Sequence, residues 1–311
     1  ESDYTYPKKL KEEIKSWVGR YMLDVENFRT DDKQRILNEV YEMTEKRFEV
    51  ARHLVTEKEW DLFIMVEMGP DRMHHAFWAH HDSTHFKHDP NSPFKNAIKD
   101  YYKFLDEKIG ELISFFPDNT VVLVVSDHGV QKMEGGIAVN DWLIEKGYLV
   151  LKEKPEKPTR IGKLISESRI DWSKTKAWGM GGYYGRLFIN VEGREPEGVV
   201  PKHEYESFRD QLISELEAIT DENGKNIGTK VFKPEEIYKK VNNIPPDLII
   251  YFGNLTWRSI GSVGNETIWL HENDTGPDDA NHAEDGIVIS SEGEVPRKIY
   301  EIRDLVLRFF D

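Results

Sequence analysis

The strongest constraint on the fold is an apolar run, Thr120–Val125, that ends in the turn Ser126-Asp127-His128-Gly129. A run so rich in β-branched residues predicts a strand buried on both faces, as in the centre of a parallel sheet. Open α/β sheets place ligands at the carboxyl ends of such strands, and Asp127 and His128 are metal-binding residue types. The alternative is a plain strand-to-loop junction in which the aspartate only makes a hydrogen bond.

Composition limits the class of protein. With 311 residues the chain can bury a large core, as one α/β domain or as one domain with an insertion. Its apolar stretches are shorter than a membrane span and follow no charged leader, which predicts a cytoplasmic protein. Because the chain has no cysteine, any metal site must use carboxylates and imidazoles.

The charge balance limits the partners. A formal net charge of −15 argues against a nucleic-acid polymer as the main partner, since that requires a basic surface. A small anionic substrate remains compatible, because bound cations reverse the local field. Abundant Lys and Glu with few Gln also fit a thermophilic source. No feature of the sequence indicates the oligomeric state.

Hydrophobic periodicity predicts alternating helices and strands. Helices are expected at residues 7–16, 32–56, 93–116, 140–146, 204–219 and 299–310, and buried strands at 60–66, 120–125, 186–191, 247–252 and 287–290. The order of strand 60–66, helix 93–116 and strand 120–125 is typical of a βαβ unit in a parallel sheet. The pattern therefore predicts a doubly wound α/β sheet with an inserted region between about residues 130 and 280.

A second candidate motif follows the predicted strand 60–66. Proline suits the first turn of a helix, so Pro70 places Asp71 and His75 one turn apart on one helical face. Oxygen and nitrogen ligands with this spacing can hold one divalent cation. The alternative is an aspartate that caps the helix and a histidine on the surface.

The remaining histidines offer weaker signals. Six of the eleven lie between His74 and His88, which is either a metal-binding tract or a loop in which one or two are ligands. Near the C-terminus His282 precedes the strand 287–290 and could reach the same sheet edge as Asp71 and Asp127, or could be an ordinary loop histidine.

The five candidate residues together support a metal site more strongly than each does alone, because one crevice at the strand ends would bring all five together. They are Asp71, His75, Asp127, His128 and His282. Acid and imidazole groups in this number indicate metal-assisted transfer at phosphorus or sulfur, with two cations about 3.5–4 Å apart holding the attacking and leaving oxygens.

The ordered motifs D-x-x-x-H, SDHG and N-H-x-x-D-G resemble the alkaline phosphatase superfamily, and most of all its type I phosphodiesterase/nucleotide pyrophosphatase family in the archaeal form. The stretches DRMHHAFW, VNDWLIEKGYLVL and PPDLIIYFG are similar to that form as well. The resemblance implies one alkaline-phosphatase-like domain over residues 1–311. Its doubly wound, mostly parallel sheet would lie between helices, with an inserted subregion at about 130–240.

The resemblance also implies a chemistry. Asp71, His75 and His282 would hold one metal, and Asp127 and His128 the other, with zinc as the expected ion and manganese as the alternative. A threonine or serine would attack a phosphodiester or nucleotide pyrophosphate in line, so the expected partner is a small anionic phosphoester. His74 and Asp285 are candidates to orient the ligands.

The chain departs from this family pattern at its start. The family's nucleophile and a further metal-binding aspartate accompany a first strand that precedes the D-x-x-x-H motif, and no such strand is evident here. We therefore expect an N-terminal segment to be missing from residues 1–311. Thr5 resembles a nucleophile in T-x-P but lacks the preceding strand and is taken as a loop residue, and Ser126 is structural in the family.

Three interpretations remain open. The first is a phosphodiesterase or nucleotide pyrophosphatase. The second is another reaction of the superfamily, as in a phosphonate hydrolase, a phosphomutase or a sulfatase. The third is a non-catalytic metal-binding fragment.

Overall fold

A computed structural model describes residues 3–310, and the chain divides into two compact units. Unit 1 contains the residues up to Val130 and those from His282 onward, and unit 2 contains Gln131–Asn281. The chain passes between the units twice, within strands β2 (Gly129–Lys132) and β12 (Ala280–Ala283).

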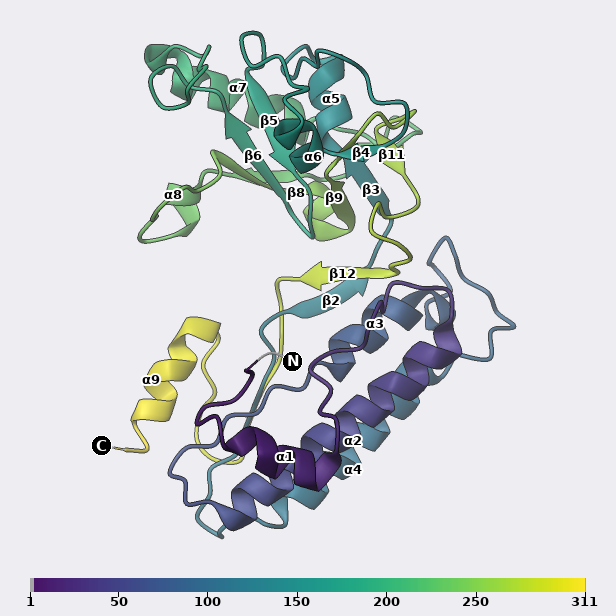
Figure 1. Cartoon of the computed structure of the whole chain (residues 1–311), viewed down its shortest axis with the longest axis vertical. Helices are drawn as coiled ribbons and strands as arrows, with labels where there is room; N and C mark the ends of the chain where they lie inside the picture. Colours follow the sequence, from purple (N-terminus) through teal and green to yellow (C-terminus); the bar gives the residue numbers. More distant parts are fainter. Residues whose placement is uncertain (1–2, 311) are drawn as a thin grey trace. The chain divides into compact units, whose positions relative to one another are not determined.

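Unit 1 is mainly helical. Helix α2 packs against both α3 and α4, and these three helices surround the apolar core of the unit (Figure 1). Asp32 caps α2 as the sequence predicts, because its side chain accepts a hydrogen bond from the Arg35 backbone N–H. The helical elements of unit 1 are α1 (Leu10–Val18), α2 (Lys33–Glu57), α3 (Gly69–His81), α4 (Ala97–Ile113), α9 (Ile302–Leu307) and the short 3₁₀ helix η3 (Ile299–Glu301).

The extended chain of unit 1 differs from the sequence prediction. Strand β1 (Leu123–Val125) forms as expected, but its partner is the antiparallel β13 (Val288–Ser290). The prediction of a strand at 60–66 is wrong, because residues 62–66 make no backbone hydrogen bond to any other residue within 3–310.

This unpaired segment is nevertheless extended and apolar. Phe63 and Met65 pack against the helical core, whereas Leu62, Ile64 and Val66 are 52%, 77% and 75% exposed. The alternation has the period of two that a strand requires. The segment therefore has the side-chain pattern of a strand without a neighbouring strand.

Unit 2 contains three small sheets. The largest is antiparallel and has the strand order β5-β6-β8-β7, and β3 is paired with β9 in parallel and with β11 in antiparallel fashion (Figure 1). Strands β10 and β4 form an antiparallel pair. The strands are β3 (Gly135–Ala138), β4 (Thr159–Arg160), β5 (Ala177–Met180), β6 (Gly185–Ile189), β7 (Lys230–Phe232), β8 (Leu248–Tyr251), β9 (Trp257–Ile260), β10 (Ser262–Val263) and β11 (Trp269–Leu270).

Helices complete the core of unit 2. Leu212 and Leu216 of α7 are fully buried in the same cluster as Leu187, Leu248 and Ile250 of the four-stranded sheet. The helical elements are α5 (Val139–Glu145), α6 (Ile161–Ser166), α7 (Tyr205–Glu217), α8 (Pro234–Ile237) and the 3₁₀ helices η1 (Lys202–Glu204) and η2 (Phe252–Leu255).

Residues 3–310 thus form a mixed α/β structure with several small sheets and nine α-helices, which is consistent with an alkaline-phosphatase-like domain. Most predicted helices are confirmed within a few residues, as α2, α4, α5 and α7 show. The doubly wound parallel sheet and the insertion at about 130–240 stay predictions. No helix in the described part of the chain is long and apolar enough to cross a membrane.

The start of α3 depends on close packing at Gly69. A Cβ atom at Gly69 would lie 1.7 Å from Tyr101 Oη, whereas one at Gly110 in α4 would meet nothing within 4 Å. We expect Gly69→Ala to lower the free energy of unfolding by about 1–3 kcal/mol through overpacking. Gly110→Ala should raise it by about 0.5–1 kcal/mol, because alanine restricts the unfolded chain. Urea unfolding of both variants checks the pair, and equal effects would contradict the packing argument.

Candidate metal centre

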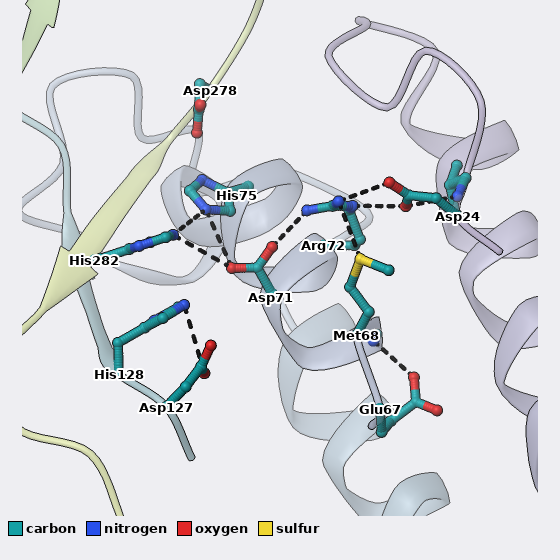
Figure 2. Close-up of polar contacts among 12 residues, drawn as sticks. Asp24, Glu67, Met68, Asp71, Arg72, His75, Asp127, His128, Asp278 and His282 are labelled. Carbon is teal, nitrogen blue, oxygen red and sulfur yellow. Dashed lines mark hydrogen bonds and ion pairs between the residues drawn. The ribbon is translucent and has the colours of Figure 1, made fainter. Parts of the chain in front are cut away.

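Three of the predicted metal ligands, all in unit 1, have their ligand atoms close to one another. The atoms Asp71 Oδ1, His75 Nε2 and His282 Nε2 form a triangle (Figure 2). Asp71 Oδ1 lies 3.4 Å from His75 Nε2 and 3.6 Å from His282 Nε2, and the two imidazole nitrogens are 3.4 Å apart. Within residues 3–310 this is the one group of three or more acidic or histidine side chains that converges in this way.

Local structure positions the three side chains. Helix α3 begins at Gly69-Pro70, with the proline in the first turn, so Asp71 and His75 lie one turn apart as predicted. His75 is only 1% exposed. His282 comes from strand β12, more than two hundred residues away in the sequence. The site therefore joins one local pair of residues to one distant residue.

The triangle has the dimensions of a tetrahedral metal site. Zinc binds His nitrogen and carboxylate oxygen at about 2.0–2.1 Å, so two ligands of a tetrahedral ion lie about 3.3–3.4 Å apart. The observed separations of 3.4–3.6 Å fit this geometry with little movement. The fourth position would be available to a water molecule or a substrate oxygen, as in catalytic rather than structural zinc sites.

The carboxylate of Asp71 is held in its charged form. Burial acts to raise its pKa, but hydrogen bonds with His282 and His75, together with the charges of His75 and Arg72, outweigh the burial and keep the pKa well below its usual range. An ionised carboxylate is the state that a divalent cation requires of its ligand.

Asp127 and His128 form a second pair beside the triangle. The His128 ring stacks on the His282 ring, with centroids 3.7 Å apart and an angle of 12° between planes. His128 Nδ1 lies 2.9 Å from the Gly129 carbonyl oxygen, which can only accept, so this nitrogen donates and Nε2 keeps its lone pair. That Nε2 faces Asp127 Oδ1 (Figure 2) at a distance of 3.6 Å, and the side chain of the aspartate is 83% exposed.

Glycines allow the two segments that carry His128 and His282 to approach. A Cβ atom at Gly129 would lie 1.9 Å from the Asp285 carbonyl oxygen, and one at Gly286 would lie 2.3 Å from Ser126 Oγ. Ser126 Oγ also accepts a hydrogen bond of 2.7 Å from the Ile287 backbone N–H. Ser126 therefore ties the chain after β1 to the chain before β13, which agrees with a structural role.

Comparison with known proteins identifies the family. A model of the type I phosphodiesterase / nucleotide pyrophosphatase family matches residues 1–278. The chain belongs to this family. Type I phosphodiesterases and nucleotide pyrophosphatases are hydrolases of the alkaline phosphatase superfamily, are metal-dependent and act on small phosphoester substrates. No curated protein and no solved structure gives a significant match. The matched range ends before His282, so the placement of this residue beside Asp71 comes from the structure.

Several other histidines of this phosphodiesterase-family chain have structural contacts instead. In the tract between His74 and His88, His80 Nδ1 lies 2.7 Å from Ser92 Oγ, and His88 Nδ1 donates to the Ala79 carbonyl oxygen at 2.9 Å. His85 Nδ1 accepts a hydrogen bond from the Lys87 backbone N–H. These three rings organise the loop that follows α3.

The two residues expected to orient the ligands also have different contacts. His74 Nε2 lies 3.1 Å from Tyr102 Oη, and burial lowers the pKa of this histidine to about 4 although Asp71 acts to raise it. Asp285 approaches Gly129 through its backbone carbonyl oxygen. Their proposed orienting role stays a prediction.

Two charged residues beside the triangle were not among the sequence predictions. Arg72 Nη1 donates to Asp71 Oδ2 at 2.5 Å, and the same guanidinium donates to Asp24 Oδ1 and Oδ2 at 2.8 and 2.7 Å (Figure 2). Arg72 is adjacent to Asp71 in the sequence, which is a weak signal. Asp24 lies 48 positions away from Arg72, and no local pattern marks it.

The pair of Asp24 and Arg72 gives a pH-dependent contribution to stability. Burial acts to raise the pKa of Asp24, but the hydrogen bonds and charge of Arg72 lower it below its ordinary value. The contribution of a carboxyl group with a lowered pKa is present above the unfolded pKa, about 3.9, and is lost as the pH falls through the folded pKa.

We therefore expect the free energy of unfolding of Asp24→Asn to be lower than that of wild type at neutral pH, and this difference to close as the pH falls below about 4. Urea unfolding of both proteins between pH 3 and 7 measures the difference. Glu26→Gln removes the exposed partner of Arg20 in the same loop and should cost less than about 1 kcal/mol. A loss of unfolding free energy in Asp24→Asn that does not change with pH would contradict the ion-pair explanation.

Proposed function

We propose that the chain provides the metal-binding part of a hydrolase that cleaves phosphodiester or nucleotide pyrophosphate bonds. The observation that carries the proposal is the triangle of Asp71, His75 and His282, whose separations of 3.4–3.6 Å suit one tetrahedral divalent cation. The family supports the reaction class, because its members hydrolyse phosphodiesters or nucleotide pyrophosphates.

The residues of the site have separate roles in this proposal. A divalent cation, with zinc preferred and manganese as the alternative, would act as a Lewis acid toward a phosphoryl oxygen and would lower the pKa of a coordinated hydroxyl group. Asp71 supplies the negative charge of the set, and His75 and His282 supply neutral nitrogen ligands. His75 is almost fully buried, whereas the side chains of Asp71 and His282 are 24% and 25% exposed, so water reaches the set through these two residues.

Asp127 and His128 are proposed to hold a second cation. Their facing atoms are 3.6 Å apart, which again suits two ligands of one ion, and His128 Nε2 has its lone pair available. Two protein ligands alone hold a metal less tightly than three. We therefore expect the second cation to bind more weakly than the first.

The nucleophile is proposed to lie on a segment outside residues 1–311. The described candidates are engaged elsewhere, since Thr5 Oγ1 donates to the Lys8 carbonyl oxygen and Ser126 Oγ accepts from Ile287 N–H. The unpaired, extended segment 62–66 supports a further strand beside it, because its exposed apolar side chains and its backbone groups lack the neighbour that a sheet would supply. The doubly wound sheet of the family would then be completed by that strand.

Zinc binding tests the three-ligand site. We expect Asp71→Asn, His75→Ala and His282→Ala each to weaken the tightest Zn²⁺ binding by at least about 100-fold, because each removes one direct ligand. Competition against a chromophoric chelator measures the dissociation constants. His203→Ala removes a histidine that is exposed in unit 2 and should leave them unchanged. If wild type binds no zinc or manganese, the metal site is refuted.

Stoichiometry tests the second pair. We expect wild type to bind a second Zn²⁺ with lower affinity, and His128→Ala to abolish only this weaker event, because the ring belongs to the second pair. Titration with elemental analysis separates the two events. Loss of the tight event in His128→Ala would place this histidine in the first site instead.

Activity distinguishes the reaction classes. With the proposed upstream segment restored and zinc present, we expect hydrolysis of bis-(p-nitrophenyl) phosphate to exceed that of p-nitrophenyl phosphate and p-nitrophenyl sulfate. Preference for the sulfate or the monoester would indicate another reaction of the superfamily. No hydrolysis of any of the three would favour a non-catalytic metal-binding protein.

A further inference from the structure

Arg72 connects the metal-site carboxylate to the loop that precedes α2. One guanidinium nitrogen donates to Asp71 Oδ2, and the other two donate to both oxygens of Asp24 (Figure 2). Its Nη2 also lies 3.1 Å from Met68 Sδ, and the guanidinium carbon lies 4.3 Å from the centre of the Phe28 ring. The planar group is therefore held from several directions.

We propose that Arg72 is a positioning residue for Asp71 and that Asp24 sets how strongly it acts. This inference rests on the metal site of the proposed function. The hydrogen bond from Arg72 to Oδ2 opposes rotation of the carboxylate, and Oδ1 is the oxygen directed at His75 and His282. Asp71 would bind a cation through one fixed oxygen.

Asp24 offsets the positive charge that Arg72 would otherwise bring to the metal site. An arginine beside a cation site weakens the site, because its positive charge competes for the same carboxylate and repels the metal. The two-pronged pair with Asp24 neutralises this charge. The trio of Asp24, Arg72 and Asp71 then carries a net charge of −1, the same as an isolated aspartate, while the orientation of Asp71 is kept.

The anchor of Asp24 is itself fixed. Its Oδ1 accepts a hydrogen bond of 2.8 Å from the Val25 backbone N–H, and Val25 is buried in the core of unit 1. Phe28 from the same loop covers Arg72 and lies 6.3 Å, ring centre to ring centre, from His75. The loop at residues 19–31 thus supports two of the three proposed ligands, although it supplies none of them.

A purely structural role is the competing explanation. Arg72 could serve only to attach the loop to α3, and its removal would then lower stability without changing the affinity of the folded protein for metal. The two explanations differ in the zinc dissociation constant and in how the effects of Asp24 and Arg72 combine.

The test is a double-mutant cycle on the full chain with Zn²⁺ as the probe. Competition with a chromophoric chelator gives the dissociation constant, and thermal unfolding of the metal-free proteins shows that each variant folds. We expect Arg72→Met to weaken zinc binding by about 10–100-fold, the range found when the support of a metal ligand is removed. Arg72→Lys should recover only part of this loss, because an ammonium group cannot bridge two carboxylates in a fork.

Substitution of Asp24 distinguishes the positioning role from the structural role more clearly. Asp24→Asn should weaken zinc binding by about 10-fold or more when Arg72 is present, since the arginine charge then falls on Asp71 alone. In the Arg72→Met background the same change should alter the dissociation constant by less than about 3-fold. Arg20→Gln, which breaks the exposed Arg20–Glu26 pair of the same loop, is the matched control and should leave zinc binding unchanged.

The outcomes separate this inference from the proposed function. Wild-type affinity in folded Arg72→Met, or additive effects of Asp24→Asn and Arg72→Met, overturns the positioning role while leaving the metal site intact. Failure of the wild-type chain to bind zinc overturns the metal site itself, and with it the inference.

Discussion

Two imidazole nitrogens and a carboxylate oxygen within 3.6 Å of one another are hard to hold together in a protein. Lone pairs at this distance repel unless a proton or a cation lies among them. The packing of unit 1 opposes this repulsion through the buried helix α3, the glycines at 129 and 286, and the arginine that fixes Asp71. Such convergence has a cost in folding, which a bound divalent ion would offset.

Local patterns account for most of what the sequence predicted. Helices such as α2 and α4 follow from apolar spacing, and the pairing of Asp71 with His75 follows from one helical turn. The convergence of His282 with this pair was expected from the rule that ligands gather at strand ends and from the resemblance to the family. The structure brings the three together, whereas Asp127 and His128 form a separate pair beside them.

Non-local interactions account for what the sequence could not predict. The segment 60–66 has a strand-like composition, but a strand requires a partner, and composition does not reveal whether one is present. Strand β5 was not predicted, and the short loop that joins it to β6 favours the antiparallel pairing observed. The contact of Arg72 with Asp24 joins residues 48 positions apart, and no periodic pattern in the sequence indicates such a pair.

The exposed row of Leu62, Ile64 and Val66 has a further consequence for the behaviour of the chain in solution. An open, extended edge with aliphatic side chains is a template for aggregation, and no proline, bulge or lysine protects residues 62–66. The net charge of −15 supplies the opposing force, because copies of the chain repel one another. Salt screens that repulsion over about 8–10 Å at physiological ionic strength but leaves the apolar attraction, so the colloidal stability of the chain depends on the ionic strength of its surroundings.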